Sequence, residues 1–337
     1  MHITFSLSTL FTWLNLLVHI AQAMSEPRLL TQFPPSVRIE NLTILPNGTI
    51  VVCNAYTGDL YSINPLSRLS RRAPYLFASL APYSSAIFGL ASPSPDTIVA
   101  TASNFSWEKG LVEPGSNVVQ HVTLTEAGGA KVKAFPIPSA GWLNGLTHVP
   151  RSPHYLLVAD CVAGSLLRLD TRTGCIETVS SDPLFAPIPE PESNLLLGIN
   201  GIHAQDGWLY FTNTNQGVYG RLAITSEGRA VGTPAEVVTR GLNGSTFDDF
   251  ALRQDGVAFL ATGLGGLNGI EKITADGQGQ MVASWEYGSP VISQPVSAVF
   301  GQTIKDRSTL YFATAGSYLG SNVTSTGGQL FSLKVRC

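Results

Sequence analysis

The chain has little charge and lacks the signatures of several enzyme and binding classes. Only 13% of its 337 residues are charged, and the formal net charge is -3. Lys and Arg are scattered and form no basic stripe, so nucleic acid is not an expected partner. The chain contains no Gly-x-Ser-x-Gly motif and no Cys and His that can be paired as nucleophile and base. The glycine-rich residues 263–266 precede no helical pattern, so we expect no nucleotide cofactor.

Long apolar runs are also missing, except at the N-terminus. Residues 1–23 are rich in leucine and end in Ala21-Gln22-Ala23, the small-x-small pattern that signal peptidase cleaves. The apolar core of this segment is shorter than the ~20 residues needed to span a bilayer. We predict a signal peptide over 1–23, a single domain over 24–337, a location in the secretory pathway or outside the cell, and no membrane association after cleavage. An uncleaved anchor is the alternative.

Asparagine sequons agree with this secretory route. Five Asn-x-Ser/Thr sequons follow the predicted signal, at Asn41, Asn47, Asn104, Asn243 and Asn322. We expect glycans on some of the last four. Asn41 is expected to be bare, because it is predicted to begin an inner strand that faces crowded protein.

The four cysteines leave two interpretations open. They are Cys53, Cys161, Cys175 and Cys337. Disulfides are permitted in an oxidising compartment, but burial as small apolar residues is equally consistent with the apolar run around Cys53. No spacing among them is typical of a metal site.

One sequence pattern recurs at a spacing of about fifty residues, within the range of propeller blades. Each copy opens near an Asn or Asp and continues as short apolar strands separated by turns. Clear copies begin at 40, 144, 200 and 248, and looser ones lie near 87 and 298. The 33 Gly and 21 Pro residues supply turns, while β-branched and aromatic runs favour strands over helices. The sequence therefore predicts an all-β fold, a six-bladed β-propeller with a central axial pocket.

The two chain ends are predicted to close the ring. Residues 329–333 are typical of the third strand of the last blade, and residues 29–33 are predicted to add its outer strand. The innermost strand of each blade lines the axis, so loops at one end of these strands are expected to form the pocket. Two insertions in these loops, 107–116 and 182–194, are candidate lids.

The loops expected around the pocket are rich in aromatic residues. We expect a small apolar substrate to contact Trp142, Tyr219, Phe247 and Tyr318, together with Asn213. About half of the aromatic residues in these loops are expected to pack between blades instead. Two histidines, His148 and His203, fall in the middle of inner strands, where a hydrogen-bonded core histidine is a more common outcome than a general base.

The inner-strand motifs resemble those of the gluconolactonase and senescence-marker-protein-30 superfamily. The resemblance covers all six blades and rests on Glu40-Asn41-Leu42, Leu143-Asn144-Gly145-Leu146, Asn200-Gly201-Ile202 and Asp248-Asp249-Phe250-Ala251-Leu252. The first and last of these, with residues 209–214, are similar to a secreted fungal branch that includes the hetero-Diels-Alderases of tropolonic sesquiterpenoid pathways.

The parent superfamily implies a divalent cation on the axis. Its ligands would be Glu40, Asn200 and Asp248, whose hard oxygen donors suit calcium or magnesium. Counted back from the turn glycines, Asn200 lies seven residues away, whereas Glu40 and Asp248 lie eight away. A complete metal site is therefore no better supported than a structural role for these side chains at the strand starts.

Three functions are consistent with the sequence. The first is a hetero-Diels-Alderase, or pericyclase, that joins a tropolone-derived ortho-quinone methide to a humulene-type sesquiterpene in fungal secondary metabolism and needs no cofactor. Its candidate catalytic residues are Glu40, Asn144, Asn200 and Asp248, with Asn213 and Tyr219 as further hydrogen-bond donors. The second is a metal-dependent lactonase or esterase that uses Glu40, Asn200 and Asp248. The third is a non-catalytic binding propeller. Apolar small molecules are the expected partners.

Overall fold

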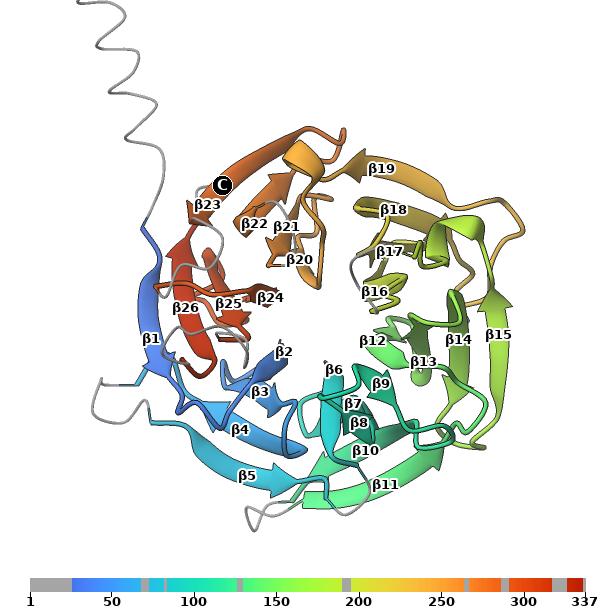
Figure 1. Ribbon diagram of the computed structural model, residues 1–337, viewed down its shortest axis with the longest axis horizontal. Helices are drawn as coiled ribbons and strands as arrows, with labels where there is room; N and C mark the ends of the chain where they lie inside the picture. The colour runs from blue at the N-terminus through green and yellow to red at the C-terminus, as the bar shows by residue number, and fades with distance from the viewer. Residues whose placement is uncertain are drawn as a thin grey trace, which may run out of the picture.

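The computed structural model describes residues 26–67, 73–81, 84–125, 130–189, 195–263, 267–285, 291–316 and 326–335. These residues form six four-stranded antiparallel sheets arranged as blades around a central axis (Figure 1). The predicted six-bladed β-propeller is confirmed. The helical elements among the described residues are two short 3-10 turns, η2 (Pro183–Phe185) and η3 (Leu242–Gly244), neither of them able to cross a membrane. The predicted signal peptide lies outside the described residues.

Each blade runs from an inner strand at the axis to an outer strand at the rim. Blade one contains β2 (Ile39–Ile44), β3 (Ile50–Asn54), β4 (Asp59–Ile63) and β5 (Tyr75–Ser79). Blade two contains β6 (Ala86–Ser94), β7 (Thr97–Ser103), β10 (Val118–Leu124) and β11 (Ala130–Pro136). Blade three contains β12 (Leu143–Val149), β13 (Ser152–Asp160), β14 (Ser165–Asp170) and β15 (Ile176–Ser180).

The second half of the ring follows the same plan. Blade four contains β16 (Ile199–Gln205), β17 (Trp208–Asn213), β18 (Val218–Ala223) and β19 (Glu236–Arg240). Blade five contains β20 (Phe250–Leu252), β21 (Ala258–Thr262), β22 (Asn268–Ile273) and β23 (Gly279–Trp285). Blade six contains β24 (Pro295–Phe300), β25 (Thr309–Thr314), β26 (Gln329–Lys334) and, at the rim, β1 (Arg28–Gln32). A separate hairpin, β8 (Phe105–Ser106) with β9 (Leu111–Val112), rises from blade two.

The ring closes by joining the two ends of the chain in one sheet, as the sequence predicted. Arg28 pairs with Ser332 and Gln32 with Gln329, so the first strand forms the outer edge of the last blade. Without β1, the last blade would lack its fourth strand and the edge of β26 would be exposed. Pairing with β1 covers that edge and closes the ring.

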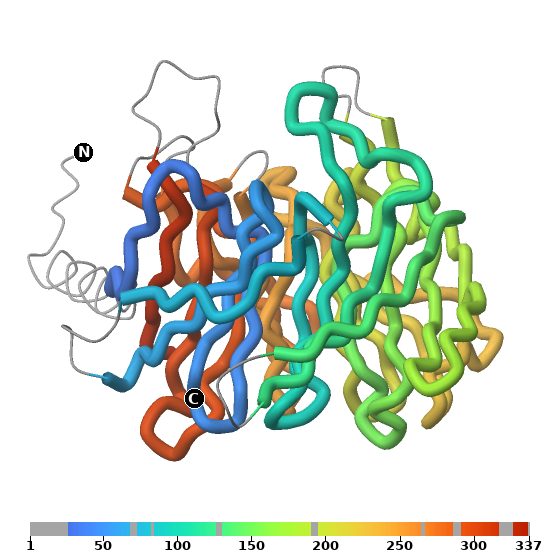
Figure 2. Tube along the Cα trace, turned by 90° about the horizontal axis from the view of Figure 1, so that it is seen from below, coloured from blue at the N-terminus to red at the C-terminus, as the bar shows by residue number. Residues whose placement is uncertain are grey.

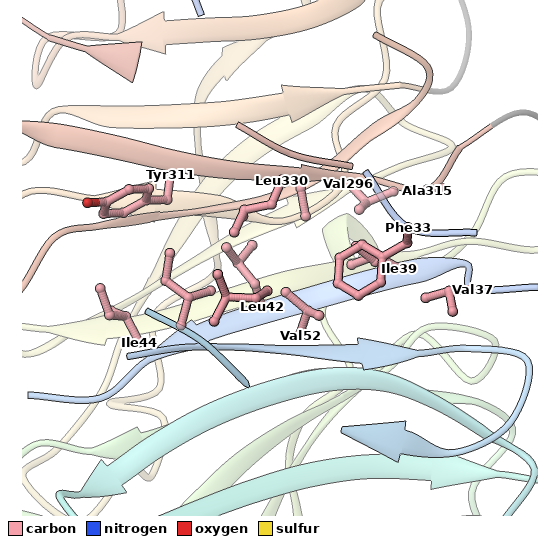
Figure 3. Close-up of a cluster of buried hydrophobic side chains, with 13 residues drawn as sticks. Phe33, Val37, Ile39, Leu42, Ile44, Val52, Val296, Tyr311, Ala315 and Leu330 are labelled. Atoms are coloured by element: carbon pink, nitrogen blue, oxygen red, sulfur yellow. The ribbon is translucent and has the colours of Figure 1, made fainter. Parts of the chain in front are cut away.

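The core consists of apolar layers between adjacent blades. Between blades one and six, Ile39 and Leu42 on β2 pack against Val296 and Leu330 of the last blade (Figure 3). All four side chains are at most 3% exposed. Burying a side chain of this size contributes about 1.5–3 kcal/mol, so these layers hold the inner strands at fixed positions around the axis.

The sequons and cysteines are placed as follows. Asn41 is buried, whereas Asn47, Asn104 and Asn243 are exposed, and Asn322 lies outside the described residues. Cys53 and Cys161 are buried free thiols and Cys175 is an exposed one, while Cys337 lies outside the described residues. Burial raises the pKa of Cys53 to about 12, as expected of a small core residue.

Candidate functional site

Four blades carry equivalent side chains at one end of the axis. Near the start of β2, β12 and β16 the pairing register shifts, so that two residues of the inner strand face one residue of its neighbour. The first residues of these bulges are Glu40, Asn144 and Asn200. Asp248 takes the same place before β20, because Asp248 N–H and Asp249 C=O both bond to Ala261. We call Glu40, Asn144, Asn200 and Asp248 the axial quartet.

Counting back from the turn glycines placed Asn200 one residue out of step with Glu40 and Asp248. The pairing of the strands explains this difference. The β16–β17 connection is a two-residue turn, Asp206-Gly207, with φ values of 49° and 82°. The β2–β3 connection is longer and spans residues 45–49. Turn length therefore differs between blades while the bulge stays in place, and Asn200 is in register with Glu40 and Asp248.

Glycine after each amide of the quartet brings neighbouring inner strands together. A Cβ on Gly145 would lie 2.2 Å from the carbonyl oxygen of Asn200, and one on Gly201 would lie 2.6 Å from Cα of Asp249. Only glycine allows so close an approach between two backbones. These Asn-Gly pairs therefore set the spacing of the quartet rather than forming hairpin turns.

Both acids of the quartet resist ionisation. Burial raises the pKa of Asp248 well above its usual range, and the charges of Glu40 and Asp249 raise it further, while Arg38 and a hydrogen bond from Asn200 lower it. Burial likewise raises the pKa of Glu40, and Arg38 opposes this shift. A buried carboxyl that keeps its proton can act as a hydrogen-bond donor or a general acid.

A second polar layer lies directly beside the quartet and is hydrogen-bonded throughout. Asp249 Oδ2 accepts hydrogen bonds from Asn41 Nδ2 at 3.0 Å and from Ser297 Oγ at 2.9 Å. Asp249 Oδ1 lies 3.1 Å from His203 Nε2. His203 is thus paired with Asp249, with its side chain 33% exposed, and burial lowers the pKa of His148. We assign this layer a structural role.

An aromatic wall stands beside the quartet. It comprises Phe88, Phe105, Trp107 and Trp142, with ring centroids 4.7 Å apart for Phe105–Trp107 and Phe105–Trp142, and 5.0 Å apart for Phe88–Trp142. Cys161 packs in the same cluster and hydrogen-bonds with the Asn144 side chain, which links the wall to the quartet. The indole Nε1 of Trp142 is buried without a hydrogen-bond partner.

The first candidate lid carries part of this wall. The β8–β9 hairpin projects from one end of the propeller (Figure 2) and supplies Phe105, with Trp107 in its turn. A cavity of about 440 Å³ opens at the hairpin and is lined by Ser85, Phe105, Leu111 and neighbouring residues. The second candidate lid is anchored differently, since Asp182 accepts hydrogen bonds from the N–H groups of Leu184 and Ala235.

Several predicted substrate contacts lie in the core instead. Tyr219 is 1% exposed and Phe247 is 0% exposed, and the two pack together between blades four and five. Asn213 Nδ2 donates to two backbone carbonyls of residues 184 and 186, so its amide has no donor left for a ligand. Tyr318 lies outside the described residues. Of the predicted contacts that the structure describes, Trp142 is placed beside the quartet, and it is itself only 7% exposed.

The cation implied by the superfamily fits these residues poorly. Glu40, Asn200 and Asp248 converge and offer hard oxygen donors. However, Asn200 directs its Nδ2 toward Thr214 Oγ1 at 2.9 Å and toward Asp248, and the guanidinium of Arg38 already lies against Glu40. A divalent cation would face amide hydrogens and a second positive charge.

Sequence reasoning missed Arg38. It stands two residues before Glu40, where a single arginine gives no sign of being buried. Its side chain is only 9% exposed, because Trp107 and residues near the start of blade six cover it.

Comparison with known proteins agrees with the resemblance stated above. The chain is 26% identical over 317 residues to asR5, a candidate hetero-Diels-Alderase of Sarocladium schorii, covering 84% of this chain and 77% of that one. It is 24% identical over 315 residues to a candidate hetero-Diels-Alderase of a Phoma species, covering 84% and 85%. The chain is similar to hetero-Diels-Alderase-like proteins. No family model matches it.

Solved structures share the fold. Regucalcin of Agrobacterium tumefaciens, described as a calcium-binding protein, matches with a TM-score of 0.58 and 17% identity over 93% of this chain and 96% of its own. A gluconolactonase of Xanthomonas campestris matches with a TM-score of 0.59 and 12% identity over 94% and 92%. The gluconolactonase-like propeller architecture is therefore confirmed, and at these identities the likeness concerns the fold alone.

Proposed function

We propose that the protein is a hetero-Diels-Alderase that couples a tropolone-derived ortho-quinone methide to a humulene-type sesquiterpene alkene. The observation that carries this proposal is the junction of an aromatic wall with four buried polar side chains at one end of the axis. Trp107 is the partly exposed member of the wall, and together with the cavity beside Phe105 it offers apolar surface to the reactants, while the quartet offers hydrogen bonds to the oxygens of one of them. Similarity to two hetero-Diels-Alderase-like relatives supports the assignment.

The cycloaddition itself requires no nucleophile. The diene and the alkene form one C–C and one C–O bond together, and no atom leaves. Holding the two reactants face to face supplies part of the ~7–11 kcal/mol available from oriented proximity. Asn144 donates a hydrogen bond to a diene oxygen, which makes the diene more electron-poor and stabilises charge in the transition state. Asn200 directs its amide hydrogens to Thr214 and Asp248 and holds the acid in place. Asn213 and Tyr219, the other donors considered, are committed to the core.

The same site can form the quinone methide from a hydroxymethyl precursor. The protonated carboxyl of Asp248 gives its proton to the hydroxyl group, and the C–O bond breaks to release water. The acidic enol of the tropolone gives its proton to solvent on binding, its oxygen becomes a carbonyl as the C–O bond breaks, and Asp248 regains a proton from solvent after the reaction. Glu40 is the second acid available for this step. Removal of water from the site protects the quinone methide from hydration.

The proposal includes no metal or nucleotide cofactor, apolar small molecules as substrates, and a place in the secretory pathway. A metal-dependent lactonase is the competing function, because the fold is gluconolactonase-like and two acids with an amide converge on the axis. That chemistry would need a cation to polarise the ester carbonyl. A non-catalytic binding propeller would use the same wall without turnover.

Chiral product analysis tests the proposal. The purified protein is incubated with a hydroxymethyl tropolone precursor and humulene, beside buffer and a heat-denatured sample. We expect faster formation of one stereoisomer than in either control. Trp142→Ala should alter the isomer ratio, because the wall selects the alkene face, whereas Trp208→Ala on β17 should not. Equal rates and isomer ratios with protein and with buffer would refute the function, and hydrolysis of simple lactones would favour the competing one.

A further inference from the structure

Arg38 is a buried cation whose hydrogen bonds are incomplete. Its side chain is 9% exposed, and Nη2 donates to Gln294 Oε1 at 3.2 Å. Nε and Nη1 are both shielded from solvent and have no hydrogen-bond partner. Buried guanidinium donors are almost always paired, so two unpaired nitrogens in one group point to a partner that is supplied from outside the chain.

The nearest acid does not complete these bonds. Nε of Arg38 lies 4.0 Å from Oε2 of Glu40, which is an electrostatic contact but too long for a hydrogen bond. Burial raises the pKa of Glu40, so this acid tends to hold a proton and to leave the guanidinium charge unbalanced. Positive charge is therefore available at the axis for an anionic ligand.

Arg38 is also held in place before any ligand arrives. Its guanidinium lies 5.1 Å from the ring centroid of Trp107, and Trp107 is fixed by a hydrogen bond from Nε1 to the carbonyl oxygen of Ala55 at 3.1 Å. The backbone N–H of Arg38 donates to Asn54 Oδ1 at 3.1 Å. A guanidinium stacked on an indole keeps its plane and its charge, which suits recognition of a flat anion.

We propose that Arg38 binds an oxygen anion of the ligand, and that the ligand class is a planar conjugated enolate such as a tropolonate. Its ring would lie along the aromatic wall while its negatively charged oxygen accepts hydrogen bonds from Arg38. The choice of tropolonate rests on the proposed function, but the anion site does not. The charge of Arg38 takes the place at the axis that a metal cation would otherwise fill.

Binding of tropolone tests this role without any turnover. The full-length secreted protein is titrated by calorimetry with tropolone and with its neutral methyl ether, at a pH where tropolone is ionised. The wild type should prefer the anion to the ether. Arg38→Gln should weaken tropolone binding at least about tenfold, as expected for the loss of a charged hydrogen bond, and should leave the ether unchanged. Arg38→Lys should recover part of the affinity.

Arg221→Gln is the matched control. Arg221 also stacks on an indole, 4.3 Å from the centroid of Trp208, and pairs with Glu236 at 2.9 Å, but it lies on the outer part of blade four. This variant should bind tropolone as the wild type does. Should Arg38→Gln fail to fold, the preference of the wild type for the anion and the weakened binding by Arg38→Lys test the same claim.

The possible results separate this inference from the proposed function. Equal affinity of the wild type and Arg38→Gln for tropolone, or equal affinity of the wild type for tropolone and its ether, would overturn the anion site. Arg38-dependent binding by a protein that does not accelerate the cycloaddition would support the anion site and reject the pericyclase. Stereoselective turnover by the wild type, with unchanged tropolone affinity in Arg38→Gln, would support the pericyclase and reject the anion site.

Discussion

Asn41 donates a hydrogen bond from Nδ2 to Oδ2 of Asp249, 208 residues further along the chain. Blade six lies between these two residues in the ring, and its Ser297 donates a hydrogen bond from Oγ to the same oxygen at 2.9 Å. Three inner strands are therefore tied to one carboxylate at the axis, next to the quartet. The bond also buries the Asn41 amide, which removes it as a glycan acceptor in the folded protein.

Asn41→Ala should destabilise the propeller by about 1–3 kcal/mol. The substitution leaves one oxygen of a buried carboxylate with fewer donors, and the desolvation of that oxygen is no longer offset. Urea unfolding measures the change. Gln302→Ala, at an exposed loop position, should stay within about 0.5 kcal/mol of the wild type. A loss for Asn41→Ala no larger than that of the control would contradict the network.

Asp248 should make a contribution to stability that falls as pH rises from about 4 toward neutrality. An unfolded Asp loses its proton near pH about 3.9, whereas burial holds the folded pKa of Asp248 well above that. Between these two pKa values the folded state binds more protons than the unfolded state, so the free energy of unfolding decreases with pH. Asp248→Asn should reduce this slope.

Unfolding experiments across this pH range check the slope. Glu40 shifts in the same direction, so Asp248→Asn should retain part of the decline. Asp255→Asn, an exposed acid at the opposite end of blade five, is the control. Parallel pH profiles for the wild type and Asp248→Asn would show that the acid ionises normally.

Removal of the Asn144 amide should reduce turnover without abolishing it. One donor to a developing oxyanion contributes about 2–3 kcal/mol, which corresponds to roughly 30- to 160-fold in rate, while proximity is left intact. Single-turnover kinetics of Asn144→Ala measure this loss, and Gln254→Ala at the other end of the axis provides a control. Complete loss of activity would indicate an indispensable polar group, which a pericyclase of this kind does not have.

Chelation should change turnover and thermal stability little. The Asn200 amide and Arg38 oppose a cation between Glu40 and Asp248, and the proposed cycloaddition uses no Lewis acid. Activity and melting curves are compared with and without EDTA. Lost activity that returns with calcium or magnesium would support the lactonase.

Mass spectrometry of the protein expressed in a eukaryotic host checks the predicted secretory route. We expect an N-terminus near residue 24 and glycans on some of Asn47, Asn104 and Asn243, which are exposed, or on Asn322. Asn41 should be unmodified. A retained N-terminal segment, or no mass change after deglycosylation, would count against secretion.

The sequence by itself determined the architecture and its closure. A repeat of strands and turns can bury its apolar faces only by stacking equal units in a ring, and the spare strands at the two chain ends complete one blade. Both features follow from local sequence patterns, which can be read directly along the chain. The quartet was also visible, because each member opens a repeat.

The tertiary structure alone decided which side chains can meet a ligand. The sequence assigns Phe247, Tyr219 and Asn213 to the pocket, yet Tyr219 and Asn213 lie in β18 and β17, and neighbouring blades cover all three. Arg38 became part of the site for the same reason, since its cover comes from Trp107 in blade two and Gln294 before blade six. Burial of a loop residue depends on partners far away in the chain, and no local pattern carries that information.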